Sequence, residues 1–106
     1  MPLYAVIGLD HVPHAMPLRD ASRTAHREYV LAHDEPIQQV AVMLDDDDNQ
    51  CGSMYFFEAE SEQAVRDWLA KEPFVATGVY ADVIVRRVML GMSRITPSDW
   101  PSRQPG

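Results

Sequence analysis

Cysteine is nearly absent from this 106-residue chain, in which Cys51 is the single example. A lone thiol forms no intramolecular disulfide and no multi-cysteine metal cluster, and such sparse use of cysteine is typical of a reducing compartment. Long apolar runs are also missing. The one near the N-terminus, residues 3–9, is too short to span a membrane, and no basic leader precedes it. We therefore expect a cytoplasmic protein.

Positive charge is scarce as well, with nine Lys and Arg residues against sixteen Asp and Glu residues and a formal net charge of −7. Nucleic-acid binding requires a basic stripe or patch, and the only adjacent basic pair is Arg86 and Arg87. We therefore expect neither nucleic acid nor an anionic membrane surface as a partner. The glycine-rich phosphate loops and the G-x-S-x-G nucleophile motif are absent too, and we expect no redox cofactor.

A chain of this length has the size of one domain. Its composition, 46% hydrophobic and 24% charged, is ordinary for a globular protein. A monomer this small leaves much of its surface exposed, so burial between two copies would stabilise it. We expect a folded domain over residues 1–90 and an irregular tail over residues 91–106, in which Trp100 docks either on the body or on a partner chain.

Hydrophobic spacing predicts four strands and two helices in the order β-α-β-β-α-β. This order is that of the ferredoxin-like α+β fold, an antiparallel four-stranded sheet with both helices on one face. The other face carries large apolar side chains, which favours dimerisation through the sheet. The predicted strands cover residues 3–9, 37–44, 53–57 and 80–89, the helices cover residues 18–33 and the segment from Ser61, its N-cap, to Pro73, and residues 10–17 and 45–50 connect them.

His26 is the first candidate for chemistry. In the first predicted helix it projects about 100° away from an apolar stripe, and Arg23 shares its side. This arrangement suits a general acid or base beside a cation that holds an anionic substrate group. The alternative is a histidine with ordinary hydrogen bonds. The stripe consists of Leu18, Ala21, Ala25, Tyr29 and Ala32.

Glu72 is the second candidate, because the Pro73 ring drives the preceding residue toward an extended conformation. The carboxylate can then orient His26 or accept a proton itself. The alternative is a solvated carboxylate at a helix C-terminus, where the helix dipole disfavours negative charge. Asp10 and Asp82 remain open as other partners for His26.

Metal binding has a weaker basis. Asp10, His11 and His14 form D-H-x-x-H, in which two histidines and a carboxylate can ligate a metal. They lie in a proline-bearing loop without a second cluster, so we expect no metal. The acidic run at residues 45–48 lacks the glycine and glutamate of a calcium loop and predicts a solvated hairpin turn. Cys51 has no basic neighbour that would activate it as a nucleophile.

Four segments together resemble the YciI-like (YCII-related) family over residues 3–89. They are R-T-A-H at 23–26, G-S at 52–53, E-A-E-S at 58–61 and E-P-F-V-A-T-G-V-Y-A-D-V-I-V at 72–85. The resemblance implies a ferredoxin-like fold that dimerises through its sheets, a dimeric α+β barrel. It also implies an active site built on a histidine, which falls on His26, and an aspartate, which falls on Glu72.

The chain departs from the family pattern at two places. Glutamate replaces aspartate at 72, and A-V-M at 41–43 replaces the family's A-G-P. One branch of the family is similar to enzymes that remove chloride from chlorinated hydroxyhydroquinones. Most relatives have no known function.

These observations predict acid–base chemistry, an elimination or isomerisation, on a small cyclic or carbonyl compound. His26 is the general acid or base, Glu72 orients it, and Arg23 holds an anionic or phenolate group. Ser53 and Tyr80 line the pocket. Two other readings remain: ligand binding without catalysis, and a module that binds another protein. The expected partners are a small molecule and a second copy of the chain.

Overall fold

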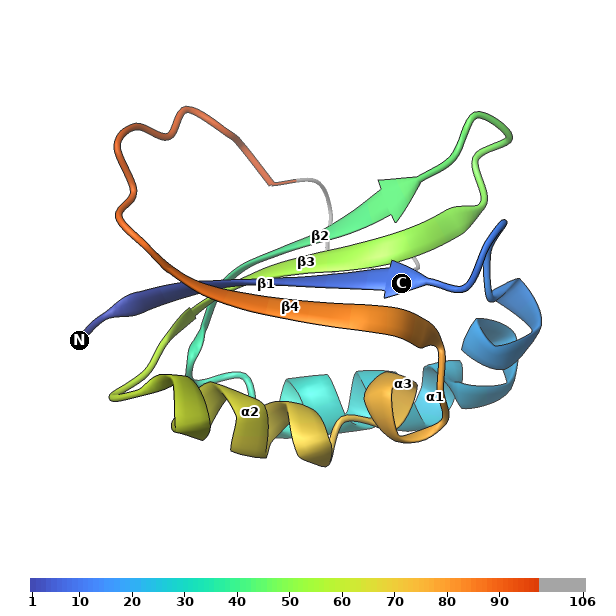
Figure 1. Cartoon of the computed structure of the whole chain (residues 1–106), viewed down its shortest axis with the longest axis horizontal. Helices are drawn as coiled ribbons and strands as arrows, with labels where there is room; N and C mark the ends of the chain where they lie inside the picture. Colours follow the sequence, from blue (N-terminus) through green and yellow to red (C-terminus); the bar gives the residue numbers. More distant parts are fainter. Residues whose placement is uncertain (98–106) are drawn as a thin grey trace.

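The computed structural model describes residues 1–97. Four antiparallel strands form one sheet in the order β2-β3-β1-β4, and the helices cover one of its faces (Figure 1). The predicted ferredoxin-like α+β fold is confirmed. The elements are β1 (Leu3–Asp10), α1 (Met16–Ala32), β2 (Ile37–Leu44), β3 (Gln50–Glu58), α2 (Glu62–Ala70), α3 (Pro73–Ala76) and β4 (Tyr80–Val88).

Strand β1 lies between β3 and β4 and pairs antiparallel with both. Its side chains alternate, so that Tyr4 and Val6 point into the core beneath the helices. Asp10 is the last residue on this inner face and is also buried. The core therefore ends in a polar region at the carboxyl end of β1. The main cluster of buried core residues is Tyr4, Val6, Tyr55, Phe57, Ala59, Val65, Leu69 and Val85.

Helix α1 buries a different face from the predicted one. It begins at Met16, two residues early, with Pro17 in its first turn, where the missing N–H does no harm. The predicted stripe is wrong, because Leu18, Ala21, Ala25 and Ala32 are exposed and Tyr29 is only partly buried. A polar row faces the sheet instead, because the polar end of the sheet supplies its hydrogen-bond partners. This row consists of Arg19, Ser22 and His26, followed by Val30.

Helix α2 begins as predicted, with the Ser61 side chain accepting a hydrogen bond from the Ala64 N–H. Ala64 itself is exposed. After α2 the chain forms a short helix that the sequence did not predict, α3, with Glu72 as its N-cap in the extended conformation expected before proline. Gly78, with φ of +81°, then turns the chain into β4.

Smaller differences concern the ends of elements. Asp10 belongs to β1 and not to the following loop, and β3 begins at Gln50, three residues before the prediction. Residues 89–97 contain no helix or strand and run on the side of the sheet away from the helices (Figure 1). The predicted docking of Trp100 lies outside the described residues. Among residues 1–97, no helix has the length and apolar character needed to cross a bilayer.

Candidate functional site

His26 and Glu72 meet beneath the sheet although 46 residues separate them. Both are buried, with exposed fractions of 4% and 1%. His26 Nδ1 contacts Glu72 Oε1 directly. The glutamate oxygens also accept the Phe74 N–H at 3.1 Å and the Val75 N–H at 3.3 Å, the free donors of the first turn of α3. The carboxylate therefore lies at the start of a helix, where the helix dipole favours negative charge.

The two ring nitrogens of His26 have different surroundings. Nδ1 faces the carboxylate, which fixes it as the hydrogen-bond donor. Nε2 has no hydrogen bond within residues 1–97, and it is not among the fully buried polar atoms that lack a partner. Nε2 is therefore the nitrogen that solvent or a ligand reaches. The ring stacks on Phe74, with centroids 3.8 Å apart and planes 6° from parallel, which holds its orientation.

Asp10 is the partner of Arg19 and not of His26. Arg19 Nε donates to Asp10 Oδ2 at 2.6 Å, and Nη2 donates to Oδ1 at 2.8 Å, a bidentate pair that is fully buried. The Ala15 N–H also donates to Oδ2, at 3.3 Å. Asp82 is exposed on β4. The structure thus selects Glu72 as the carboxylate beside His26, and the other two partners left open by the sequence are wrong.

Arg19 is the buried cation that sequence reasoning missed. Burial alone would lower its pKa, but the hydrogen bond to Asp10 and nearby charges raise the pKa above its ordinary value. Arg19 stands seven residues before His26, two helical turns, so both lie on one face of α1. The seven-residue spacing in the sequence therefore predicts that Arg19 shares a helix face with His26.

Ser53 and Tyr80 lie together beside Arg19. The Tyr80 hydroxyl donates to Ser53 Oγ at 2.8 Å, and Arg19 Nη2 donates to the same oxygen at 3.2 Å. Burial raises the pKa of Tyr80 far above its ordinary value, so the phenol stays protonated at neutral pH. A Cβ at Gly8 would lie 2.7 Å from the Tyr80 ring. Glycine at this position of β1 is therefore what allows the ring to lie there.

Arg23 is engaged away from this group. Its guanidinium donates to Asp20 at 2.5 Å and to Gln50 at 2.6 Å. The side chain is 19% exposed, and α1 turns it away from the buried row that contains His26. The structure therefore brings His26 to Glu72 and Ser53 to Tyr80, but it places Arg23 with neither pair. Its role in holding a substrate stays a prediction.

The residues of the D-H-x-x-H motif are separated in the structure. Asp10 faces Arg19, His11 is exposed, and His14 Nδ1 accepts the Met16 N–H at 3.2 Å. Within residues 1–97, no group of three or more His, Cys, Asp and Glu side chains is placed to hold a metal ion. Cys51 is a free, partly buried thiol on β3.

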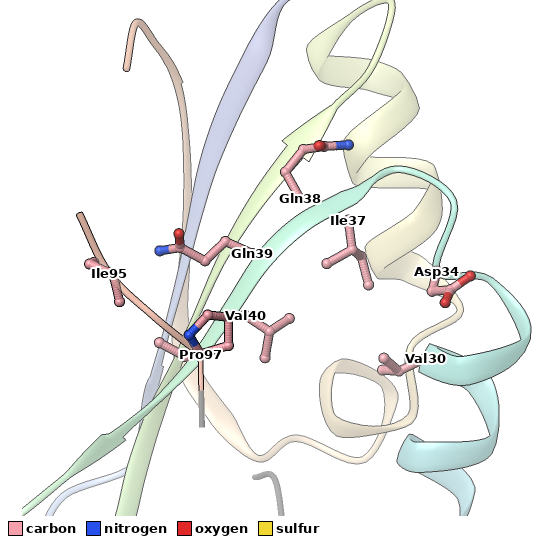
Figure 2. A pocket seen from close by; sticks show the side chains of 9 residues that line it. Val30, Asp34, Ile37, Gln38, Gln39, Val40, Ile95 and Pro97 are labelled. Atoms are coloured by element: carbon pink, nitrogen blue, oxygen red, sulfur yellow. The ribbon is translucent and has the colours of Figure 1, made fainter. Parts of the chain in front are cut away.

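A cavity of about 420 Å³ lies beside α1 and β2 (Figure 2). The Gln39 side chain lies on the same side of β2 as Ile95 and Pro97 of the C-terminal segment, whereas Val40 points to the opposite side, toward the helices (Figure 2). Among the described residues, Asp34 is the only acidic or basic side chain that lines it, and neither buried pair reaches it. Its chemistry is that of an apolar groove with amide groups. The lining residues are Val30, Asp34, Ile37, Gln38, Gln39, Val40, Ala41, Ile95 and Pro97.

Comparisons with known proteins agree with the fold and with the resemblance. The model of the YCII-related domain matches residues 3–89. An uncharacterized protein of Haemophilus influenzae is 34% identical over 96 residues, covering 79% of this chain and 94% of that protein. The 5-chloro-2-hydroxyhydroquinone dehydrochlorinase of Burkholderia phenoliruptrix, solved with 2,5-dihydroxybenzoquinone, is 29% identical with a TM-score of 0.75, covering 84% of this chain and 95% of that one. This chain belongs to the YCII-related domain family.

Proposed function

We propose that the chain is an acid–base enzyme that acts on a small cyclic or carbonyl compound by elimination or isomerisation. One observation carries the proposal: His26 presents Nδ1 to the buried Glu72 carboxylate, and within residues 1–97 Nε2 has no hydrogen-bond partner. A histidine used only for packing or structure would ordinarily have both nitrogens satisfied when it is this deeply buried.

The mechanism follows from the fixed tautomer. Because Nδ1–H donates to Glu72, the lone pair of the neutral ring lies on Nε2, which accepts a proton from the substrate. The resulting imidazolium is stabilised by the adjacent carboxylate, as in other carboxylate–histidine pairs. Stacking on Phe74 keeps the ring in one plane through the cycle. Glu72 thus acts on the substrate only through His26.

The substrate class is proposed from the dehydrochlorinase, whose structure holds a dihydroxybenzoquinone. A dehydrochlorination fits the His26 geometry. The base removes a proton from the substrate, and the carbon–chlorine bond breaks with its electron pair leaving on chloride. The net change is loss of HCl, and no electron acceptor is required. We propose an oxygen-bearing six-membered ring as the compound that this chain binds.

The test is chloride release from 5-chloro-2-hydroxyhydroquinone. His26→Gln removes the base while keeping a polar side chain of similar length, and we expect turnover to fall by about 10²- to 10⁴-fold. His33→Gln is the matched control, because His33 is an exposed histidine at the end of the same helix. Binding of 2,5-dihydroxybenzoquinone without chloride release from related chlorinated substrates would instead establish a ligand-binding protein without catalysis.

We also propose that two copies pack through the outer face of the sheet. On this face Ile7 of β1 lies opposite Met54 of β3 and Ile84 of β4, and all three are only partly buried in the single chain. Phe56 extends the same apolar surface. A surface of this kind on so small a domain favours an interface over exposure to water.

A further inference from the structure

The guanidinium of Arg19 has one nitrogen without a partner. Nε and Nη2 are satisfied by Asp10 and Ser53. Nη1 is fully buried, and no atom of residues 1–97 accepts a hydrogen bond from it. A buried charged donor without an acceptor is unfavourable, and most such groups in native proteins are paired or serve a function. Nη1 is therefore a buried donor that residues 1–97 leave without an acceptor.

The neighbouring hydroxyls supply a second available donor. Ser53 and Tyr80 share one hydrogen bond, yet each hydroxyl carries one proton. Whichever of the two donates, one proton remains, because Arg19 Nη2 only donates to Ser53 Oγ. Burial raises the pKa of Tyr80, so its proton is not lost at neutral pH. Within residues 1–97, neither hydroxyl donates a hydrogen bond to Asp10, whose oxygens accept from Arg19 and the Ala15 N–H. The group of Arg19, Ser53 and Tyr80, here called the donor cluster, thus has donors to offer.

We propose that the donor cluster binds an oxygen atom of the substrate, either a ring carbonyl or an ionised ring hydroxyl. This assignment rests on the proposed function, whose substrate it restricts to rings with such an oxygen. Donors match the lone pairs of oxygen and exclude an ammonium group, which has no lone pair to accept a hydrogen bond. Because Asp10 already balances the Arg19 charge, the cluster suits an oxygen that is neutral or singly ionised, on which charge develops during proton transfer.

The position of the cluster relative to His26 supports this assignment. Arg19 and His26 face the same way on α1, and both lie against Phe74. The Phe74 ring centre is 5.1 Å from Arg19 Cζ and 3.8 Å from the centre of the His26 ring. Tyr80 meets Phe74 edge-on, with centroids 6.4 Å apart. An oxygen held by the cluster would therefore lie on the same side of α1 as His26.

The experiment uses 2,5-dihydroxybenzoquinone as the probe and isothermal titration calorimetry as the measurement. We expect Tyr80→Phe and Ser53→Ala each to weaken binding by about five- to tenfold, and Arg19→Lys, which loses the planar fork, by about tenfold or more. Arg66→Lys is the matched control and should bind as the wild type does, since Arg66 pairs with Glu62 on the exposed face of α2. Circular dichroism checks that each variant is folded.

The outcomes separate this inference from the proposed function. Folded Tyr80→Phe and Ser53→Ala variants that bind as tightly as the wild type would overturn the donor cluster, even if Arg19→Lys fails to fold. Failure of the wild-type chain to bind 2,5-dihydroxybenzoquinone at millimolar concentration would also overturn it. If the variants lose binding but the wild type releases no chloride, the cluster stands and the catalytic proposal fails. If chloride release persists at the full rate in all three variants, the catalytic proposal stands and the donor cluster has no role in holding the substrate.

Discussion

At the residue scale, the buried phenols determine how the protein responds to alkali. Tyr55 and Tyr80 both lie under the helices, and burial is the main cause that raises their pKa values above the ordinary value of about 10. In the unfolded chain the same phenols ionise near pH 10. The native state therefore binds more protons than the unfolded state above that pH.

We predict that the free energy of unfolding is insensitive to these tyrosines below pH 10 and falls as the pH rises above it. The expected slope is about 1.4 kcal/mol per pH unit for each tyrosine until the folded-state pKa is reached. Urea unfolding between pH 9 and 12 measures it. The Tyr55→Phe and Tyr80→Phe double variant should lose most of this slope, and an unchanged slope would contradict the assignment.

Single residues also show how far the sequence led toward the site. His26, Glu72, Ser53 and Tyr80 were all candidates, and the structure joins them as two contacting pairs. Arg19 was missed, since a substrate-holding role was assigned to Arg23 alone among the arginines. The seven-residue spacing from His26 predicts a shared helix face for Arg19, but its burial depends on Asp10 from another element, and no local pattern in the sequence predicts that pairing.

At the scale of elements, Glu72 has two structural roles. It begins α3 by accepting two backbone N–H groups, and it holds the imidazole presented by α1. The start of a four-residue helix and the orientation of the histidine are therefore coupled through one carboxylate. Ser22 Oγ adds a second link by donating to Thr77 Oγ1 at 3.0 Å, just after α3.

Substitutions at Glu72 should separate these roles. Asp is a good N-cap with a shorter side chain, so Glu72→Asp should change stability by about 1 kcal/mol or less while turnover falls, because the carboxylate no longer reaches His26. Glu72→Ala loses the cap and the buried partner together and should cost about 3 kcal/mol. Chemical denaturation and chloride release measure the two effects. Equal stability of both variants would show that the cap, which only Asp retains, contributes little to stability.

The elements themselves were predicted unevenly, for physical reasons. Strand alternation and the Ser61 cap are local features of the sequence. They were sufficient to predict β2, the start of α2 and the order of the elements. Helix α3 has only four residues, too few for a periodic pattern, and its start depends on how Pro73 follows an extended Glu72. The prediction of which face of α1 is buried was wrong, because hydrogen bonds to other elements bury the polar face and leave the apolar stripe exposed.

At the scale of the whole molecule, the proposed dimer makes a simple prediction. Multi-angle light scattering at micromolar concentration should give about twice the 12.0 kDa chain mass. Ile7→Lys places a charge in the middle of the outer sheet face and should yield monomers. Leu31→Lys, on the exposed side of α1, is the control and should leave the mass unchanged. A 12 kDa wild-type species would contradict the dimer.

The sheet order has a consequence for how the protein is made. Strand β1 lies inside the sheet, and one of its two neighbours, β4, is the last strand of residues 1–97 to be synthesised. A nascent chain can form the β2–β3 hairpin early, but β1 keeps an open edge until residues 80–88 emerge from the ribosome. Tyr80 belongs to that final segment. Any product of premature termination before it therefore lacks part of the site and exposes an apolar strand, which marks it for aggregation or proteolysis.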